Sequence, residues 1–247
     1  MRRLAVEFDG EVEFSFVMSG IREKPPGPDE VENWLEASAS SGMPVDVRMW
    51  LDGGGPASTY PACMAVKAAA EQGDPADFLR GLREGFAFRG RRLDHAEAFE
   101  AVARDRGGLD LARLRIDMGS HAILEAFGGD LERARAVDPE HHSPQRDRVK
   151  LPSIEFVGED GEVHGVYGPA AYERYRDAAV AAGAKPSGAD PPGVLEALGR
   201  FGTMSTAEVA AVCQLAGPRA PAELWALASD WKVSVERTLG GEVWSPA

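Results

Sequence analysis

The chain has 247 residues and a mass of 26.4 kDa, enough for one large domain or two small ones with a buried core. Its formal net charge of −13 disfavours nucleic acid and anionic membranes as main partners. No apolar run approaches the roughly 20 residues that span a bilayer, and no apolar signal-peptide core follows Met1. The two cysteines, Cys63 and Cys213, lie far apart and indicate no disulfide framework. These features predict a cytoplasmic protein.

The first part of the chain carries both helical and extended patterns. Leu4 and Phe8 are one helical turn apart, which predicts the end of a helix. From Glu11 to Met18, apolar side chains alternate with polar ones, which predicts a strand. Asp29 and Glu32 then form the capping-box pattern of a helix N-terminus.

From residue 58 to about 137 the pattern is almost entirely helical. Four polar residues stand before apolar runs, where a helix N-cap is expected: Asp94, Asp110, Ser120 and Asp130.

The next segment, Asp138 to Lys150, is polar and contains a proline, which predicts an exposed loop. It holds the pair His141-His142. Adjacent histidines point in different directions, and no cysteine or third histidine lies near, so we expect no metal site.

The stretch from Lys150 to Gly183 predicts a hairpin followed by a helix. Pro152 stands before an apolar run, and a proline fits the start of a strand because it cannot donate to the ladder. Gly158 to Gly161 is a turn signal, after which the chain returns as a second strand. Gly168-Pro169 starts the helix, since proline is tolerated in a first turn, and Gly183 ends it.

Proline, strand, turn, strand, glycine and helix in this order resemble the C-terminal half of a thioredoxin-like fold, in particular the FrnE-like branch of the DsbA family. The segments NWLEASASSGMP, YPACMAVKAAAEQG and GLREGFAFRGRRLDHAEAFEAVARDRGGLD resemble the same branch. The resemblance covers residues 1–183. It implies an α/β fold in which a thioredoxin-like sheet carries a helical insertion over about 58–137, within a domain of residues 1–184.

The resemblance also implies a site. Pro152 would be a cis proline facing redox cysteines, and Leu151 and Ser153 would flank it, so that these three residues bind an extended substrate. The implied function is that of a cytoplasmic thiol–disulfide oxidoreductase, which acts without a cofactor on a protein or small-molecule thiol or disulfide.

The catalytic residues of the resembling family are missing from this sequence. In the family a C-x-x-C motif follows the first strand and begins the first helix, whereas Met1 matches the second half of that helix. We therefore expect an N-terminally incomplete domain without catalytic residues, and a start further upstream. The present cysteines do not replace the motif. Cys63 stands in a helix's first turn without a second cysteine, and Cys213 has core neighbours.

Two alternatives stay open. Kappa-class glutathione transferases and hydroxychromene carboxylate isomerases share this architecture and use glutathione, with a serine in place of the first cysteine. That serine would also lie in the missing segment. The other alternative is a non-catalytic thioredoxin-like binding protein.

The last part of the chain, residues 193–247, follows a proline-rich linker. Three helical patterns precede a predicted hairpin over 233–244, and this order resembles a winged helix. Residues 190–247 hold seven acidic and four basic residues, a net charge of −3, whereas phosphate binding needs the opposite balance. We expect a small winged-helix-like domain that serves packing or a homodimer and does not bind DNA.

Overall fold

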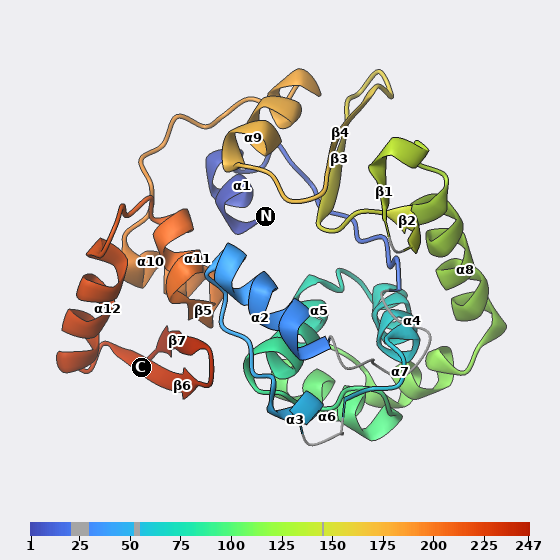
Figure 1. Cartoon of the computed structure of the whole chain (residues 1–247), viewed down its shortest axis with the longest axis horizontal. Helices are drawn as coiled ribbons and strands as arrows, with labels where there is room; N and C mark the ends of the chain where they lie inside the picture. Colours follow the sequence, from blue (N-terminus) through green and yellow to red (C-terminus); the bar gives the residue numbers. More distant parts are fainter. Residues whose placement is uncertain (21–29, 52–54, 145) are drawn as a thin grey trace. The chain divides into compact units, whose positions relative to one another are not determined.

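The computed structural model describes residues 1–20, 30–51, 55–144 and 146–247 (Figure 1). The chain divides into two compact units. Unit 1 contains residues 1–19 and 128–191, and unit 2 contains residues 20–127 and 192–247. The division into domains 1–184 and 193–247 stays a prediction. The two compact units divide the chain differently, since unit 2 groups the C-terminal residues with the helical residues 20–127. The expected capping residue Asp29 lies outside the described residues.

Unit 1 is built on a hairpin of two strands, β3 (Ser153–Val157) and β4 (Val163–Tyr167). The strands pair antiparallel over their whole length. Two helices, α1 (Arg2–Glu7) and α9 (Tyr172–Ala181), lie beside the hairpin in Figure 1. They share one apolar cluster with it, and the buried members are Leu4, Phe8, Phe156 and Ala179. The hairpin, the helix that follows it and the helical spacing of Leu4 and Phe8 are confirmed. The predicted start of that helix at Gly168-Pro169 is wrong, since α9 begins at Tyr172 and Pro169 lies outside its first turn.

The strand predicted from Glu11 to Met18 does not form. Residues 12–20 form no strand, and no β-ladder among the described residues includes them. The alternation is nevertheless real, since Val12 and Phe14 pack on the apolar cluster of unit 1 while Glu13 is exposed. Alternation decides which side chains face a core, but a strand also needs a neighbouring backbone, and the described residues supply none here.

The segment 138–150 is more ordered than the predicted loop. It contains a 3₁₀ turn (Pro139–His141) and the short strands β1 (His142–Ser143) and β2 (Arg146–Val149). These strands pair antiparallel, with a shift in register inside β1. Val149 is buried and anchors the pair. A two-residue strand is too short for sequence alternation to indicate it.

Unit 2 is mostly helical between residues 30 and 127. Its helices are α2 (Glu30–Ser41), α3 (Arg48–Leu51), α4 (Tyr60–Ala70), α5 (Ala76–Arg83), α6 (Ala96–Arg106) and α7 (Leu111–Met118). A π-helical turn, Glu84–Phe88, continues α5. The long helix α8 (His121–Arg135) begins in unit 2 and ends in unit 1.

Two of the four predicted N-caps are confirmed. The Asp110 carboxylate accepts hydrogen bonds from the Ala112 and Arg113 amides at 2.9 and 3.0 Å, and the Ser120 hydroxyl accepts one from the Ile123 amide at 3.3 Å. The other two are wrong. His95 is the N-cap of α6, and Asp94 binds the Arg92 guanidinium instead. Asp130 lies inside α8 and accepts a hydrogen bond from the Met18 amide at 2.8 Å.

The C-terminal part of unit 2 combines three helices with a small sheet. The helices are α10 (Val194–Phe201), α11 (Thr206–Val212) and α12 (Arg219–Ser229). The strands β5 (Met204–Ser205), β6 (Val233–Thr238) and β7 (Gly241–Pro246) form an antiparallel sheet in the order β5-β7-β6. Trp244 of β7 is fully buried at its centre. The helices and the hairpin match the sequence prediction, whereas β5 was not foreseen.

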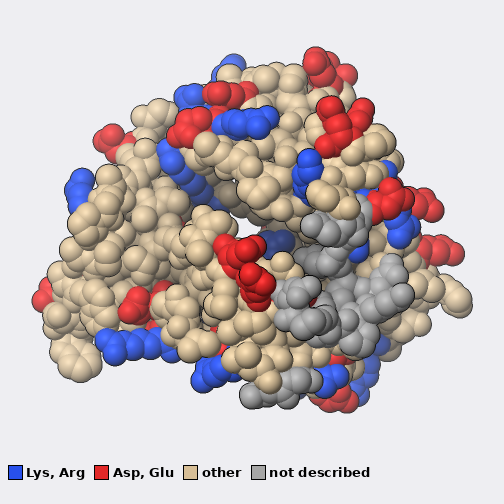
Figure 2. Space-filling model, in the orientation of Figure 1, with Lys and Arg blue, Asp and Glu red and all other residues tan. Residues whose placement is uncertain are grey.

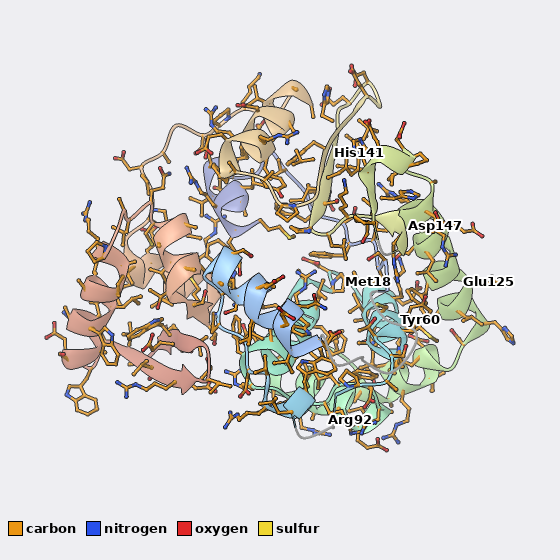
Figure 3. All side chains as sticks on the ribbon, in the orientation of Figure 1. Met18, Tyr60, Arg92, Glu125, His141 and Asp147 are labelled. Carbon is orange, nitrogen blue, oxygen red and sulfur yellow. The ribbon has the colours of Figure 1, made fainter. Side chains whose placement is uncertain are left out.

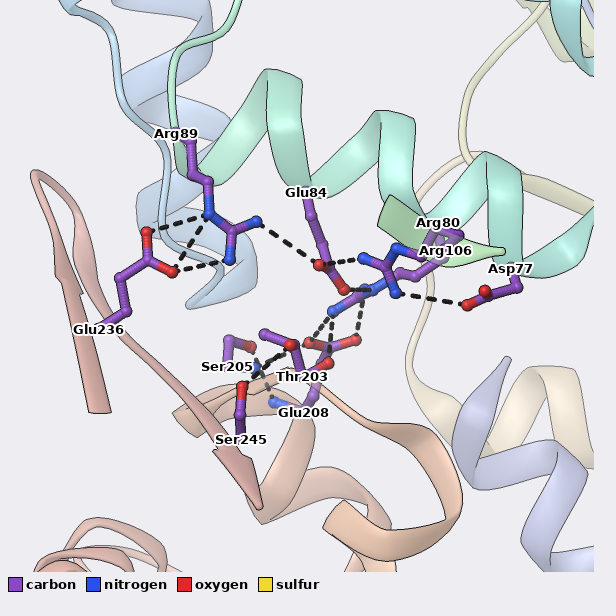
Figure 4. A network of polar contacts seen from close by, with 10 residues as sticks. All are labelled: Asp77, Arg80, Glu84, Arg89, Arg106, Thr203, Ser205, Glu208, Glu236 and Ser245. Atoms are coloured by element: carbon purple, nitrogen blue, oxygen red, sulfur yellow. Dashed lines mark hydrogen bonds and ion pairs between the residues drawn. The ribbon is translucent and has the colours of Figure 1, made fainter. Parts of the chain in front are cut away.

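A network of ion pairs runs through unit 2 (Figure 4). Its centre is the Glu84 carboxylate, which is only 1% exposed. Arg80 donates to it from Nε at 2.7 Å, Arg106 donates to it as well, and Arg89 lies 3.6 Å away. A buried carboxylate is tolerated when it is paired in this way.

The same arginines reach the C-terminal part of unit 2. Arg80 donates to both carboxylate oxygens of Glu208, at 2.8 and 2.9 Å. Arg89 likewise contacts both oxygens of Glu236, with its shortest bond at 2.7 Å. Bidentate arginine–carboxylate pairs are strong and directional. They therefore join the C-terminal helices and sheet to α5 and the π-helical turn.

Charged side chains of both signs are interspersed on the face drawn in Figure 2, and they do not merge there into one basic patch. Among the described residues, no helix combines the length and apolar composition that crossing a bilayer requires.

Candidate functional site

The three predicted binding residues lie at an exposed corner of unit 1, where the chain turns into β3. Leu151 is 46% exposed, and Pro152 is exposed as well. The peptide bond between them is cis, as the resemblance implies. Ser153, the first residue of β3, is half-buried. The structure thus presents the side chains of Leu151 and Pro152 to solvent and turns Ser153 partly inward.

The Ser153 hydroxyl holds the corner in shape. It donates to the carbonyl oxygen of Lys150 and accepts a hydrogen bond from the Gly168 amide at 3.2 Å. It therefore links the residue before the corner to the residue after β4. Both its donor and an acceptor site are used, so Ser153 positions the corner and is not a free hydroxyl.

Lys150 fixes the other side of the corner. Its amide donates to the carbonyl oxygen of His141 at 2.9 Å, and its ammonium group donates to the carbonyl oxygen of Glu140 at 3.1 Å. The 3₁₀ turn before β1 thus supports the residue that precedes Leu151. A corner held at both ends offers Leu151 in one fixed place, which lowers the entropy lost on binding.

A cluster of side chains supports the outward face of the hairpin. The ring of His141, labelled in Figure 3, stacks on the ring of Tyr167, with 4.1 Å between the centroids. The Tyr167 hydroxyl donates to Glu155 at 3.0 Å, and Arg133 donates to the other oxygen of that carboxylate at 2.9 Å. Burial, and then the hydrogen bond to Glu155, raise the pKa of the Tyr167 phenol. Tyr167 therefore stays neutral and acts as a donor.

Gly165 makes room for this cluster. It pairs with Glu155 across the hairpin, and a Cβ atom at residue 165 would lie 2.4 Å from the Tyr167 ring. Tyr167 can lie over the sheet and reach Glu155 only because Gly165 has no side chain. This cluster was not predicted from the sequence. The glycine inside an apolar strand, two residues before a tyrosine, was the signal that could have indicated it.

The edge of β3 that faces away from β4 has no ladder partner among the described residues. The Gly158 amide donates to the carbonyl oxygen of Glu162 at 2.9 Å, which makes these residues a hydrogen-bonded pair at the turn. Because antiparallel pairs alternate, Ile154 and Phe156 then bond to β4, and the backbone groups of Ser153, Glu155 and Val157 point the other way. Within the described residues β3 pairs with β4 alone. This edge begins at the corner of Leu151 and Pro152.

Both cysteines lie in unit 2, whereas the corner belongs to unit 1. Cys63 is half-buried in the first turn of α4. Cys213 follows α11 and is buried, and burial raises the pKa of its thiol to about 11. Neither forms a disulfide. A thiol with a raised pKa is a poor nucleophile at neutral pH, so Cys213 is a core residue.

The two adjacent histidines have separate partners. His141 stacks on Tyr167, whereas the His142 ring contacts the carbonyl oxygen of Val137 at 3.1 Å and Asp147 at 3.2 Å. In the part of the chain that is described, no group of three or more His, Cys, Asp or Glu residues is arranged to hold a metal ion. The absence of a metal site stays a prediction for the whole protein.

A family model described as thioredoxin matches residues 1–142, which is more than half of the chain. The chain belongs to the thioredoxin family. The match is to thioredoxin in general and ends before Leu151, so the FrnE-like branch and the binding residues remain proposals. A curated relative, the ClpXP adapter protein SpxH of Shouchella clausii (strain KSM-K16), is 27% identical over 218 residues. This similarity covers 85% of the present chain and 68% of the relative.

Proposed function

We propose that this thioredoxin-family protein belongs to the FrnE-like branch of the DsbA family and binds an extended segment of a partner protein at Leu151, Pro152 and Ser153. The observation that carries the proposal is the edge of β3 that lacks a ladder partner among the described residues, and this edge begins at the exposed corner formed by Leu151 and Pro152. An adapter role in the relative, as its name states, also favours a protein as partner. The FrnE-like branch rests on the sequence resemblance.

The proposed binding mode adds one strand to the hairpin. An extended segment lying along β3 would exchange backbone hydrogen bonds with Ser153, Glu155 and Val157, whose amides and carbonyls point away from β4. Leu151 would contact an apolar side chain of the partner, because it is exposed and held in place by the Lys150 contacts. Backbone bonds would supply affinity for many sequences, and Leu151 would supply selectivity.

The chain's own residues support binding more than electron transfer. Thiol–disulfide exchange needs a thiolate of depressed pKa and a second cysteine that resolves the mixed disulfide. The sequence has two cysteines, 150 positions apart, and the one at residue 213 has a raised pKa. We therefore propose a thiol or disulfide protein as the bound partner class, with the exchange itself depending on cysteines that these 247 residues do not contain. A cytoplasmic location belongs to the same proposal, since both cysteines are outside disulfides.

The C-terminal part of unit 2 is proposed to be a winged-helix-like packing module. Its order of elements, with α10, β5, α11, α12 and the β6–β7 hairpin, supports this. The carboxylates of Glu208 and Glu236 both accept hydrogen bonds from arginines of the helical part. With a net charge of −3 over residues 190–247, we expect no salt-dependent binding of duplex DNA by the full chain.

Amide hydrogen exchange tests the binding proposal directly. An unfolded model polypeptide with alkylated cysteines should slow exchange at Ser153, Glu155 and Val157, because their amides gain partners. Leu151→Asp should weaken this polypeptide's affinity at least tenfold, since it places a charge in the apolar contact. Val180→Asp is the matched control, because Val180 is 43% exposed on α9 of the same unit. Unchanged exchange at β3 would refute the proposal.

The redox part needs a separate measurement. The 247-residue chain should bind the polypeptide without reducing or oxidising a disulfide substrate, because it has no cysteine pair. The intact mass of the protein from its native host, before and after thiol alkylation, then decides the chemistry. Two alkylated thiols would leave a binding protein, and further thiols that oxidise together would support an oxidoreductase.

A further inference from the structure

The exposed face of α12 carries a tryptophan among small residues, and the exposed charged residues Arg219, Glu223 and Asp230 border it. Ala222, Trp225, Ala226 and Ser229 follow the spacing i, i+3, i+4, i+7 and are all exposed. The opposite face buries Ala220 and Leu224 against the rest of unit 2. The outward face of a surface helix normally carries charged or polar side chains. Here the middle of the face carries one large aromatic ring between small residues, and Ala222, Trp225 and Ala226 all remain exposed.

The Trp225 ring is held in one orientation. It meets the fully buried Trp244 edge to face, with 5.1 Å between centroids, and the Arg237 guanidinium lies 5.6 Å from its centre. Even so, Trp225 remains 38% exposed. A fixed, partly exposed tryptophan loses little entropy when a partner covers it, and tryptophan is enriched among residues that dominate interface energies.

Trp231, just after α12, is a second exposed aromatic residue and occupies an unfavourable backbone position. The helix ends in a Schellman motif, in which the Lys232 amide donates to Leu227 and the Trp231 amide to Ala228, at 2.9 and 3.0 Å. This motif places Trp231 at a φ of 58°, where glycine or asparagine is favoured. The side chain is 87% exposed, so it contributes little to the fold. A large side chain at such a position indicates a role outside the folded monomer.

We propose that α12 is the homodimer interface of this protein, with a second copy of the chain packed antiparallel on the same face. The face is self-complementary: Trp225 of one copy would fit over the small residues Ala222, Ala226 and Ser229 of the other. This inference is independent of the proposed binding at Leu151.

Charge and helix direction favour a second copy over another partner. In an antiparallel pair centred near Trp225, the N-terminal residue Arg219 of each copy lies near Asp230 and Trp231 of the other. A cation there meets the face of Trp231 and the Asp230 carboxylate, which also binds the Lys232 ammonium group of its own chain at 3.1 Å. The two helix dipoles also run in opposite directions, which is favourable. One pair of helices gives an interface at the small end of the known range, so we expect a dissociation constant on the order of 10 µM.

Sedimentation velocity of the full chain over about 1 to 100 µM, the range that such an interface requires, should show a monomer–dimer equilibrium. Ala226→Glu should weaken the dimer at least tenfold, because the two introduced carboxylates face each other at its centre. A mixture of the Ala226→Glu and Ala226→Lys chains should restore association. Ala112→Glu, on the exposed surface of α7, is the matched control and should leave the equilibrium unchanged.

Trp231→Gly separates an interface role from a structural one. Glycine suits the backbone at this position, so the unfolding midpoint of dilute protein should stay the same or rise, while the dimer weakens at least fivefold. A protein that remains monomeric throughout the concentration range would overturn the proposal. So would a dimer that Ala226→Glu and Trp231→Gly both leave intact.

Discussion

The ion network around Glu84 in unit 2 and the corner at Leu151 in unit 1 differ in how completely their polar groups are paired. The Glu84 carboxylate is 1% exposed and has three arginines around it, two of which also bind acids of the C-terminal part. At the corner, a hydrophobic side chain is 46% exposed and one edge of β3 has no ladder partner among the described residues.

This difference separates structural polar groups from those offered to a partner. A buried charge must be paired inside the protein, or folding would carry its desolvation cost. An exposed strand edge is paired by water in the free protein and can exchange that water for another chain. Stability should therefore depend on Glu84 and hardly at all on Leu151, while binding should show the opposite dependence.

Glu84→Ala should have the largest effect on stability, lowering the free energy of unfolding by about 3–5 kcal/mol, because it leaves Arg80 and Arg106 partly buried without their shared carboxylate. Urea denaturation measures it. Asp77→Ala is the control: Asp77 contacts Arg106 at 3.3 Å but is 68% exposed, and its loss should change stability by less than about 1 kcal/mol. Equal effects of the two substitutions would mean that the network is not buried as described.

Alkaline pH should lower stability through Cys213. Burial raises the pKa of this thiol from its usual 9.0 to about 11, so the folded state keeps a proton that the unfolded state has lost. The contribution is fully present below pH 9 and is lost as the pH rises to 11, and it amounts to ~2–3 kcal/mol. Cys213→Ala should remove this part of the pH dependence. The free energy of unfolding is measured against pH for the unchanged protein and for Cys213→Ala. Equal slopes between pH 9 and 11 would contradict the attribution of this pH dependence to Cys213.

Gly165→Ala should cost about 1–2 kcal/mol, because the new methyl group would meet the Tyr167 ring and disturb its bond to Glu155. Thermal unfolding measures this cost. Gly129→Ala is the opposite case, since Gly129 lies within α8 with nothing near its missing Cβ, and alanine there should stabilise by roughly 0.5–1 kcal/mol. If Gly165→Ala were also neutral or stabilising, the cluster would not depend on close packing over the hairpin.

The sequence was sufficient where local signals decide the structure. Turn glycines and a proline indicated the hairpin of β3 and β4, and helical spacing indicated α9 and α10. The sequence was insufficient where contacts with residues far away in the chain decide the structure. The alternation from Glu11 to Met18 indicated correctly which side chains face the core, but it could not show that no backbone among the described residues pairs with this segment.

The polar clusters were missed for the same reason. Arg80 and Glu208 are 128 residues apart, and nothing in either segment indicates the other. Aspartate is a residue type that favours an N-cap, yet Asp130 lies inside α8 and accepts a hydrogen bond from the distant Met18 amide. At the candidate site, the resemblance indicated Leu151, Pro152 and Ser153 together, but only the structure distinguishes the buried bonds of Ser153 from the exposed surface of Leu151.

Leu151→Ala should have the smallest effect on stability and a clear effect on binding. Its side chain is 46% exposed, so its removal should change the free energy of unfolding by less than about 0.5 kcal/mol. The affinity for an unfolded model polypeptide should nevertheless fall, because the substitution removes the apolar contact at the corner and leaves the backbone edge of β3 unchanged. Parallel urea denaturation and polypeptide titrations of this variant and Glu84→Ala complete the comparison. A large loss of stability on removing Leu151 would place that side chain in the core, and the corner would then be structural like the network around Glu84.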